Sequence, residues 1–315
     1  MKNLNVALCM IIAGMLLPSV AQPLRVVTSV NVLSQPLQAL YAAEIDAGVL
    51  SVAPLMDIGA DPHLYVPTRA DLEALIDADL ILFIGLGLEV QFADLLQRIG
   101  THRRGTNVMF VGDSVPVSLL LGKECDTPPC LVDPHIWMDP TIYAHALRAA
   151  VGAVDEALGD SAERVNRLDQ VNQLVDQLTA DIEQRFEAAQ VNVPLVTAHD
   201  AFSYYGRAFG LETVGLAGIS TDVDPSVRRV QVLAQRIVAE QIPAVFLETS
   251  VPARGVKALI VAAESQGHTV SIKGPLYTDS VGEAGTGANS WEGMLMANTI
   301  EITCALGAVT LEDCP

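Results

Sequence analysis

The chain has 315 residues, and at about 150 residues per domain this length suggests two domains, each able to bury its own core. Hydrophobic residues make up 50% and charged residues 17%, which excludes a disordered protein. Lys and Arg number 18 against 37 Asp and Glu, so the net charge is −19. Nucleic acid and anionic lipid surfaces are therefore poor partners, and a cation is the ligand that this charge favours.

Residues 1–21 have the pattern of a secretory signal peptide. Lys2 precedes an apolar run from Val6 to Leu17, and small residues occupy the positions before the expected cleavage. A membrane anchor is the alternative, but the apolar run is shorter than the about 20 residues that a span requires. Cys9 follows a leucine within the run and lacks the setting of a lipid attachment site. We therefore expect an exported, soluble mature protein.

Short apolar segments with strand-like composition alternate with helical patterns along the rest of the chain. This alternation is typical of parallel sheets with connecting helices, so we predict an α/β fold. The predicted strands are Leu24 to Val30, Val49 to Leu55, Leu80 to Gly85, Val108 to Val111, Leu195 to Thr197, Ala244 to Leu247 and Thr269 to Ile272.

Two of the predicted helices have recognisable starts. Thr68, with Asp71 three positions later, forms a capping-box pattern at the start of a helix from Arg69 to Ile76. Asp224 before a proline predicts an N-cap, followed by a helix from Pro225 to about Glu240. Both patterns predict packing and carry no chemistry.

The middle of the chain predicts one long helix. From about Ala162 to Ala189 there is no Gly or Pro, and apolar residues recur every three to four positions. A helix of about 28 residues is about 42 Å long at 1.5 Å per residue, longer than one small domain. We therefore predict two lobes with parallel sheets, residues 22–160 and 190–315, joined by a linker helix over residues 161–189 that limits hinge opening.

Four cysteines, an even number, lie outside the predicted signal peptide. In an oxidising compartment such a set predicts disulfides, and three pairings are possible. The local pairs, Cys125 with Cys130 and Cys304 with Cys314, are favoured. A four-thiolate zinc site is the alternative, but the Cys-x4-Cys and Cys-x9-Cys spacings differ from the usual C-x2-C pattern.

Three histidines and one aspartate are the strongest candidates for a binding site. His63 and His135 each follow Asp-Pro, His199 follows a predicted strand, and Asp279 lies beyond the last predicted strand. Ligand groups in open α/β sheets project from loops at the carboxyl ends of strands. Because these four residues come from separate units, two in each lobe, they can converge only in the cleft between the lobes. Three imidazoles and a carboxylate suit Zn(II), and to a lesser degree Mn(II) or Fe(II).

Taken singly, a histidine in a turn is more often structural than a ligand. We assign the other three histidines to surface or core roles: His102, His145 and His268. Carboxylates near the ligands are candidates to accept the second N–H of a ligating imidazole, although each could instead form a turn or cap. These carboxylates are Asp61, Asp133, Asp139, Asp200 and Glu248.

Four sequence motifs occur in a defined order along the chain. They are GADPHLYVPTRADLEALIDADLILFIGLGLE (59–89), DPHIWMDP (133–140), TAHDAFSYYGRAFGL (197–211) and GPLYTDS (274–280). These motifs resemble those of the substrate-binding proteins of zinc and manganese ABC importers, cluster A-I. The resemblance extends over nearly the whole mature chain.

The resemblance implies a binding protein, not an enzyme, with two α/β lobes, a rigid backbone helix and a metal site in the inter-lobe cleft. It implies that His63, His135, His199 and Asp279 hold the metal. It also implies ABC permease and ATPase subunits as partners, a periplasmic location and a monomeric protein.

The third ligand bears on the choice of metal. Manganese members of the family often carry Glu there, whereas this sequence has His199, and the softer donor set favours Zn(II) as the transported ligand. A manganese or iron binding protein is the alternative. Many zinc members carry a long His-rich loop between the first two ligands, but the interval from Glu89 to Asp133 holds only His102. We therefore hypothesise a separate metal donor, a periplasmic zinc metallochaperone.

Two other classes of protein are alternatives to the transport interpretation. A secreted zinc hydrolase also uses three histidines, but it keeps a coordination position open for water, which Asp279 would fill. Neither H-E-x-x-H nor G-x-S-x-G occurs in the sequence. A surface adhesin is disfavoured because the sequence shows no lipid attachment site.

Overall fold

The structure is a computed structural model, and it describes residues 22–92, 107–122, 132–159 and 162–314. The predicted signal peptide, His102 and the predicted Cys125–Cys130 pair lie outside the described residues. No helix within the described residues is both long enough and apolar enough to cross a membrane.

The first part of the chain builds a four-stranded parallel sheet in the order β2-β1-β3-β4. All four residues of β3 are buried, as in a strand that is covered on both faces. In register, β1 pairs with β2 from Leu24 opposite Leu50 to Thr28 opposite Pro54. The elements of this part are β1 (Leu24–Thr28), α1 (Asn31–Leu40), α2 (Ala42–Asp46), β2 (Leu50–Pro54), α3 (Arg69–Asp77), β3 (Leu80–Phe83), η1 (Val90–Phe92), β4 (Asn107–Phe110), η2 (Val111–Ser114), η3 (Val117–Leu119), η4 (Ile136–Met138) and α5 (Pro140–Leu158).

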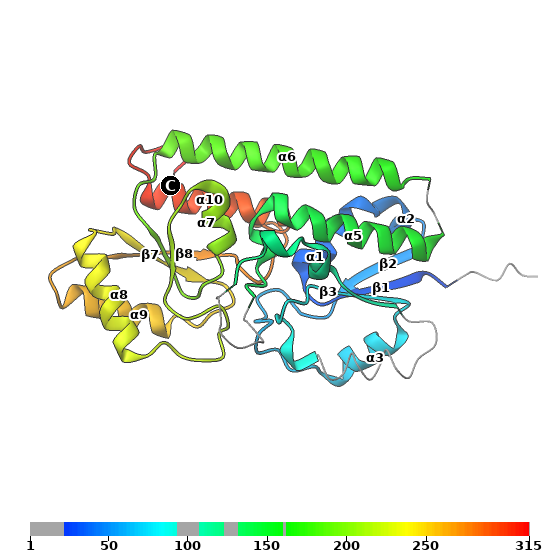
Figure 1. Cartoon of the computed structure of the whole chain (residues 1–315), viewed down its shortest axis with the longest axis horizontal. Coiled ribbons are helices and arrows are strands. Elements are labelled where there is room, and N and C mark those ends of the chain that lie inside the picture. Colours follow the sequence, from blue (N-terminus) through cyan, green and yellow to red (C-terminus); the bar gives the residue numbers. More distant parts are fainter. Residues whose placement is uncertain (1–21, 93–106, 123–131, 160–161, 315) are drawn as a thin grey trace, which may run out of the picture.

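The last part of the chain builds two parallel strand pairs, β5 with β6 and β7 with β8, and β5 contacts β7. Helices α8 and α9 pack on each other on one side of these strands, and α7 and α10 lie toward the long helix (Figure 1). The elements of this part are β5 (Leu195–Thr197), α7 (Ser203–Phe209), β6 (Thr213–Gly215), α8 (Val227–Ala239), β7 (Ala244–Glu248), α9 (Arg254–Glu264), β8 (Ser271–Leu276) and α10 (Trp291–Leu306).

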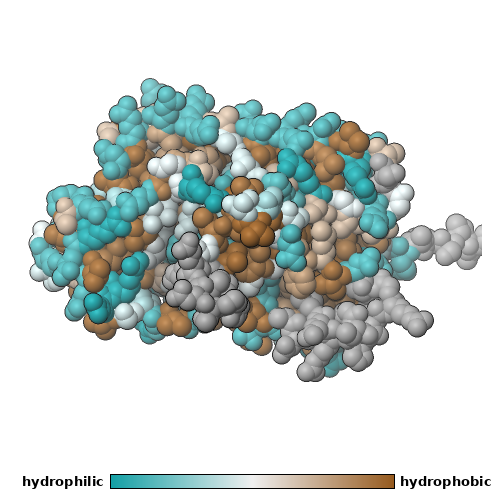
Figure 2. Space-filling model, viewed as in Figure 1, coloured by the Kyte–Doolittle hydropathy of each residue, from teal (hydrophilic) through white to brown (hydrophobic). Residues whose placement is uncertain are grey.

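The long helix α6 (Arg164–Ala189) runs along both parts of the molecule, with the first sheet toward one end and β7 and β8 toward the other (Figure 1). It packs on α5 and α10 through a buried stripe that includes Val171, Val175, Leu178 and Ile182. Figure 2 shows hydrophilic residues gathered over its outer side. One buried hydrophobic cluster continues from the first sheet through α5 and α6 to α10, so the long helix is part of a shared core.

The α/β fold with parallel sheets is confirmed, and α6 begins two residues later than expected. The division of the chain into lobes at residues 160 and 190 stays a prediction. The capping box is confirmed, because Thr68 accepts from the Asp71 N–H and Asp71 accepts from the Thr68 N–H. The local disulfide between Cys304 and Cys314 is present, with the two Cα atoms 5.3 Å apart.

Several predicted boundaries are wrong. Strand β3 ends at Phe83 because Gly85 adopts a left-handed φ of 78°, which a strand does not accommodate. The last strand runs over Ser271–Leu276, and the three-residue strand β6 is missing from the prediction. Helix α8 starts at Val227, not at Pro225, because the Ser226 side chain caps it by accepting from the Arg229 N–H. The expected cap, Asp224, is instead paired with Arg254.

A buried cluster around Arg167 fixes the first turns of α6 to the first part of the chain. The Arg167 guanidinium pairs with Asp155 of α5 at 2.5 Å and with Glu44 of α2. It also lies 4.3 Å from the ring centre of Tyr41, whose hydroxyl donates to Asp155 at 2.8 Å. Near the other end of the helix, Arg185 donates to Thr303 of α10 at 2.8 Å. Both ends of α6 are therefore tied to other elements.

Substitution Arg167→Met is expected to destabilise the protein by about 3 kcal/mol, because it leaves the buried Asp155 carboxylate without its main partner. This loss of stability lies at the low end of the range for removing one partner of a buried ion pair, because Tyr41 and Arg164 still contact Asp155. Urea denaturation followed by circular dichroism measures the loss. Arg69→Met removes an exposed ion pair and serves as control, with a change below about 1 kcal/mol. Equal stability of the two variants would contradict this role of Arg167.

Candidate metal centre

The four predicted side chains meet at one point. His63, His135, His199 and Asp279 each offer one ligand atom, and these atoms all lie within 4.8 Å of one another. His135 Nε2 is 3.3 Å from both His63 Nε2 and His199 Nε2, and 3.5 Å from Asp279 Oδ1. Ligand atoms in a tetrahedron around Zn(II), at 2.0–2.1 Å from the ion, are about 3.3–3.4 Å apart. The cluster therefore has nearly the size of a tetrahedral zinc site.

Parallel strands deliver three of these side chains. His199 follows β5 by two residues, Asp279 follows β8 by three, and His63 lies in the loop after β2. His135 immediately precedes the short helix η4. All four side chains are buried, and His63, at 5% exposed, is the most exposed of them.

The two Asp-Pro-His motifs fold in the same way. Asp61 Oδ1 accepts the His63 backbone N–H at 2.9 Å, and Asp133 Oδ1 accepts the His135 backbone N–H at 3.0 Å. Aspartate commonly accepts the N–H two residues further on, which forms a tight turn. The repeated motif therefore presents both imidazoles from turns of the same type.

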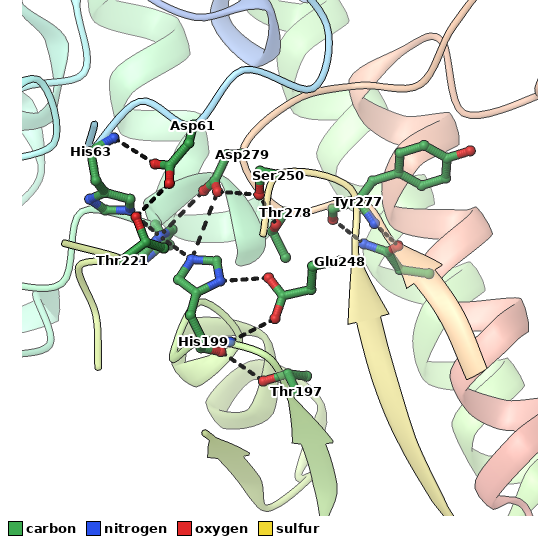
Figure 3. Close-up of polar contacts among 12 residues, drawn as sticks. Asp61, His63, Thr197, His199, Thr221, Glu248, Ser250, Tyr277, Thr278 and Asp279 are labelled. Atoms are coloured by element: carbon green, nitrogen blue, oxygen red, sulfur yellow. Dashed lines mark hydrogen bonds and ion pairs between the residues drawn. The ribbon is translucent and has the colours of Figure 1, made fainter. Parts of the chain in front are cut away.

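Carboxylates orient the rings of two ligands. Asp133 Oδ1 lies 2.7 Å from His135 Nδ1, and Glu248 Oε2 lies 2.6 Å from His199 Nδ1 (Figure 3 shows Glu248 and His199). Glu248 also accepts the His199 backbone N–H at 2.9 Å through its other oxygen. An imidazole that donates Nδ1–H to a carboxylate presents Nε2 as its lone-pair nitrogen. Both Nε2 atoms therefore face the centre of the cluster, where a bound cation would lie.

The other predicted carboxylates have different roles. Asp61 holds the main chain of His63 and not its ring. Asp139 caps α5 by accepting from the Thr141 and Ile142 N–H groups, and Asp200 accepts from the Ser203 hydroxyl at 2.7 Å, so neither orients a ligand ring.

Two other histidines and one serine have contacts that bear on the site. His268 Nε2 lies 2.9 Å from the Ile242 carbonyl, and His145 lies within α5, so both fit structural roles. Ser250 was not predicted, and its hydroxyl donates to Asp279 Oδ2 at 2.6 Å. No spacing rule connects an isolated serine to an aspartate 29 residues later, so sequence offers no signal for this contact.

Burial and charge act in opposite directions on the imidazoles. Burial disfavours the imidazolium and lowers the pKa of His63 to about 4. Burial acts on His135 in the same direction, but the carboxylates of Asp133 and Asp279 outweigh it and raise its pKa to about 10. The pKa of His199 also rises, because neighbouring carboxylates outweigh its burial. The buried carboxylates therefore stabilise positive charge within the cluster.

Comparisons with known proteins agree with this geometry. Residues 26–305 match the family described as ZnuA, zinc-uptake complex component A, periplasmic. The zinc-binding protein TroA of Treponema pallidum is 35% identical over 284 residues, which cover 89% of this chain and 88% of that protein. The manganese-binding lipoprotein MntA of Bacillus subtilis is 36% identical over 269 residues, which cover 84% of this chain and 85% of that protein. The solved structure of the periplasmic zinc-binding protein TroA matches with a TM-score of 0.82 and 34% identity, over 90% of this chain and 99% of that one.

The fold and the family match define a solute-binding protein of the ABC transporter class. The chain belongs to the ZnuA family, whose members work with ABC permease and ATPase partners. This confirms the resemblance on which the transport interpretation was based.

Substitution Glu248→Gln is expected to weaken Zn(II) binding by about 10- to 100-fold, because the neutral amide removes the charge that pairs with His199 Nδ1. Competition with a chromophoric chelator measures the dissociation constant. Asp200→Asn is the matched control, because Asp200 is next to His199 in sequence but bonds to Ser203. If both variants bind Zn(II) equally well, Glu248 does not orient the ligand.

Proposed function

We propose that this protein is a periplasmic binding protein that captures Zn(II) and delivers it to an ABC permease for import. His63, His135, His199 and Asp279 would hold the ion between the two lobes. The observation that carries the proposal is the mutual distance of the four ligand atoms, which lie within 4.8 Å of one another on buried side chains. Membership of the ZnuA family and the similarity to TroA support it independently.

The donor set favours zinc over manganese. Three imidazole nitrogens and one carboxylate suit Zn(II), whereas Mn(II) prefers more oxygen donors and a larger coordination number. Asp279 Oδ1 is buried and accepts no hydrogen bond from the described residues, so its lone pairs are free to bind the ion. The other oxygen accepts from Ser250, which favours binding through a single carboxylate oxygen.

The proposed mechanism is reversible binding of the ion, without any covalent reaction of a substrate. Four donors fill a tetrahedron and leave no position for a reactive water, which is why we favour binding over hydrolysis. The ion bridges segments from both parts of the chain and stabilises the closed arrangement by its differential affinity for that form. We propose that a single chain in this form docks on the permease, which reopens the site to release the ion.

Titration of the purified protein with Zn(II) and Mn(II), by competition with chelators, tests the proposal. We expect one ion per chain and tighter binding of Zn(II). His135→Ala or His199→Ala is expected to weaken Zn(II) binding by about 100-fold or more, beyond the effect of losing an outer partner. His145→Ala is the control, because His145 lies within α5 and not in the cluster. Equal Zn(II) affinity of all three variants would disprove the site, and tighter Mn(II) binding would overturn the choice of zinc.

We also propose that a periplasmic metallochaperone supplies the ion. The sequence between Glu89 and Asp133 contains one histidine, His102, and so offers little for an auxiliary capture site. The expected result is faster zinc transfer from a periplasmic extract than through free zinc buffered at the same activity. Transfer at the rate set by free zinc would remove this part of the proposal.

A further inference from the structure

The loop of residues 216–226 joins β6 to α8 without helix or strand, and its first residues are bonded to the segment that carries His199. The Leu216 N–H donates to the Thr197 carbonyl at 2.9 Å, and the Ala217 N–H donates to the Ala198 carbonyl at 2.9 Å. The Gly218 carbonyl accepts from the Asp200 N–H at 3.1 Å. These bonds fix the start of the loop on both sides of His199 in the sequence.

Further along the same loop, a side chain reaches the segment of another ligand. The Thr221 hydroxyl donates to Asp61 Oδ2, across 160 residues of sequence, while Asp61 Oδ1 accepts the His63 backbone N–H. Figure 3 shows Asp61 between the His63 main chain and Thr221. One carboxylate thus connects the 216–226 loop to a ligand, and the loop links the His199 segment with the His63 segment.

A second hydrogen bond holds the His63 segment, residues 57–64, from another direction. The Gly59 N–H donates to Ser280 Oγ at 2.8 Å, and Ser280 is the neighbour of the ligand Asp279. The His63 segment is therefore joined by one bond to the 216–226 loop and by another to the segment of Asp279. Both bonds run between segments that are distant in sequence and meet beside the cluster.

The bond to Thr221 is the more accessible of the two. Asp61 and Thr221 are half-buried, whereas Ser280 is buried. A cavity of about 400 Å³ lies beside Asp61 and Thr221, and Leu64 and Val223 are among its lining residues. Water in this cavity can replace the hydrogen bond when the two segments separate.

We propose that the hydrogen bond from Thr221 to Asp61 is a latch that holds the His63 segment over the bound ion and sets the rate of ion release. The proposal rests on the proposed function. The latch forms after the ion has entered, so it acts on dissociation, and the association rate is governed by access to the open site. Thr221 and Asp61 are thus positioning residues that act on the ion through His63.

Stopped-flow release of Zn(II) into excess chelator, from wild type and from Thr221→Val, tests the latch. Valine keeps the shape of threonine and removes the hydroxyl. Loss of a hydrogen bond to a half-buried carboxylate is expected to speed dissociation about ten-fold and leave the association rate within about two-fold. Thr221→Ser retains a hydroxyl and is expected to release Zn(II) at nearly the wild-type rate. Thr221→Ala gives a second measurement without the hydroxyl.

Asp224→Asn is the matched control within the same loop, because it removes an exposed ion pair with Arg254 and no contact to a ligand segment. Its release rate is expected to equal that of wild type. Equal dissociation rates for Thr221→Val, Thr221→Ala and wild type would overturn the latch, as would a Thr221→Ser variant as fast as Thr221→Val. Absence of Zn(II) binding by the wild type in the same experiment would instead refute the proposed function.

Discussion

The structure depends on burying carboxylates and imidazoles together at one point. Asp279, Asp133 and Glu248 are each no more than 4% exposed, and an uncompensated buried carboxylate is costly. The raised pKa values of His135 and His199 show that protons can supply positive charge there. In the proposed site, a divalent cation would supply the same charge and bind the nitrogens directly. Proton and metal would then compensate the same buried charge, and binding would exchange one for the other.

Two of the four candidate ligands, His135 and Asp279, lie on segments that are fixed by buried contacts. The Trp137 indole N–H, two residues after His135, donates at 2.7 Å to the carbonyl of Thr278, the residue before Asp279. A second indole, that of Trp291 at the start of α10, donates to the Trp137 carbonyl at 2.9 Å. The core that contains both tryptophans continues into α6. The segments that carry His135 and Asp279 are therefore connected through this core to the long helix α6.

The sequence predicted the elements better than it predicted their contacts. Short apolar runs located the strands, because a strand that is buried on both faces must be apolar throughout, as β3 is. It missed β6, since Thr213–Gly215 is too short to show a pattern. The predicted start of α8 was wrong because two residues, Asp224 and Ser226, can cap a helix there. Asp224 pairs instead with Arg254, which is distant in sequence, and Ser226 forms the cap.

The candidate ligands could be named from sequence because the loops after parallel strands converge at one edge of a sheet. Their partners could not be ranked in the same way. Asp133 and Glu248 orient rings, whereas Asp139 and Asp200 form a cap and a turn, although all four occur near a ligand or a strand end. The difference is set by the direction of each side chain in the folded chain, which local sequence does not determine.

A saturated tetrahedral site constrains how an ion can leave. With four donors bound in the proposed site, no tetrahedral position would be open to an incoming ligand, so loss of one protein donor would ease exchange. Carboxylates hold the rings of His135 and His199, and Asp279 follows a residue bonded to a buried tryptophan. His63 is held through its main chain at the more exposed side of the cluster. In the proposed site, His63 would therefore be the donor that leaves at the lowest cost, and the other three would stay in place to receive the next ion.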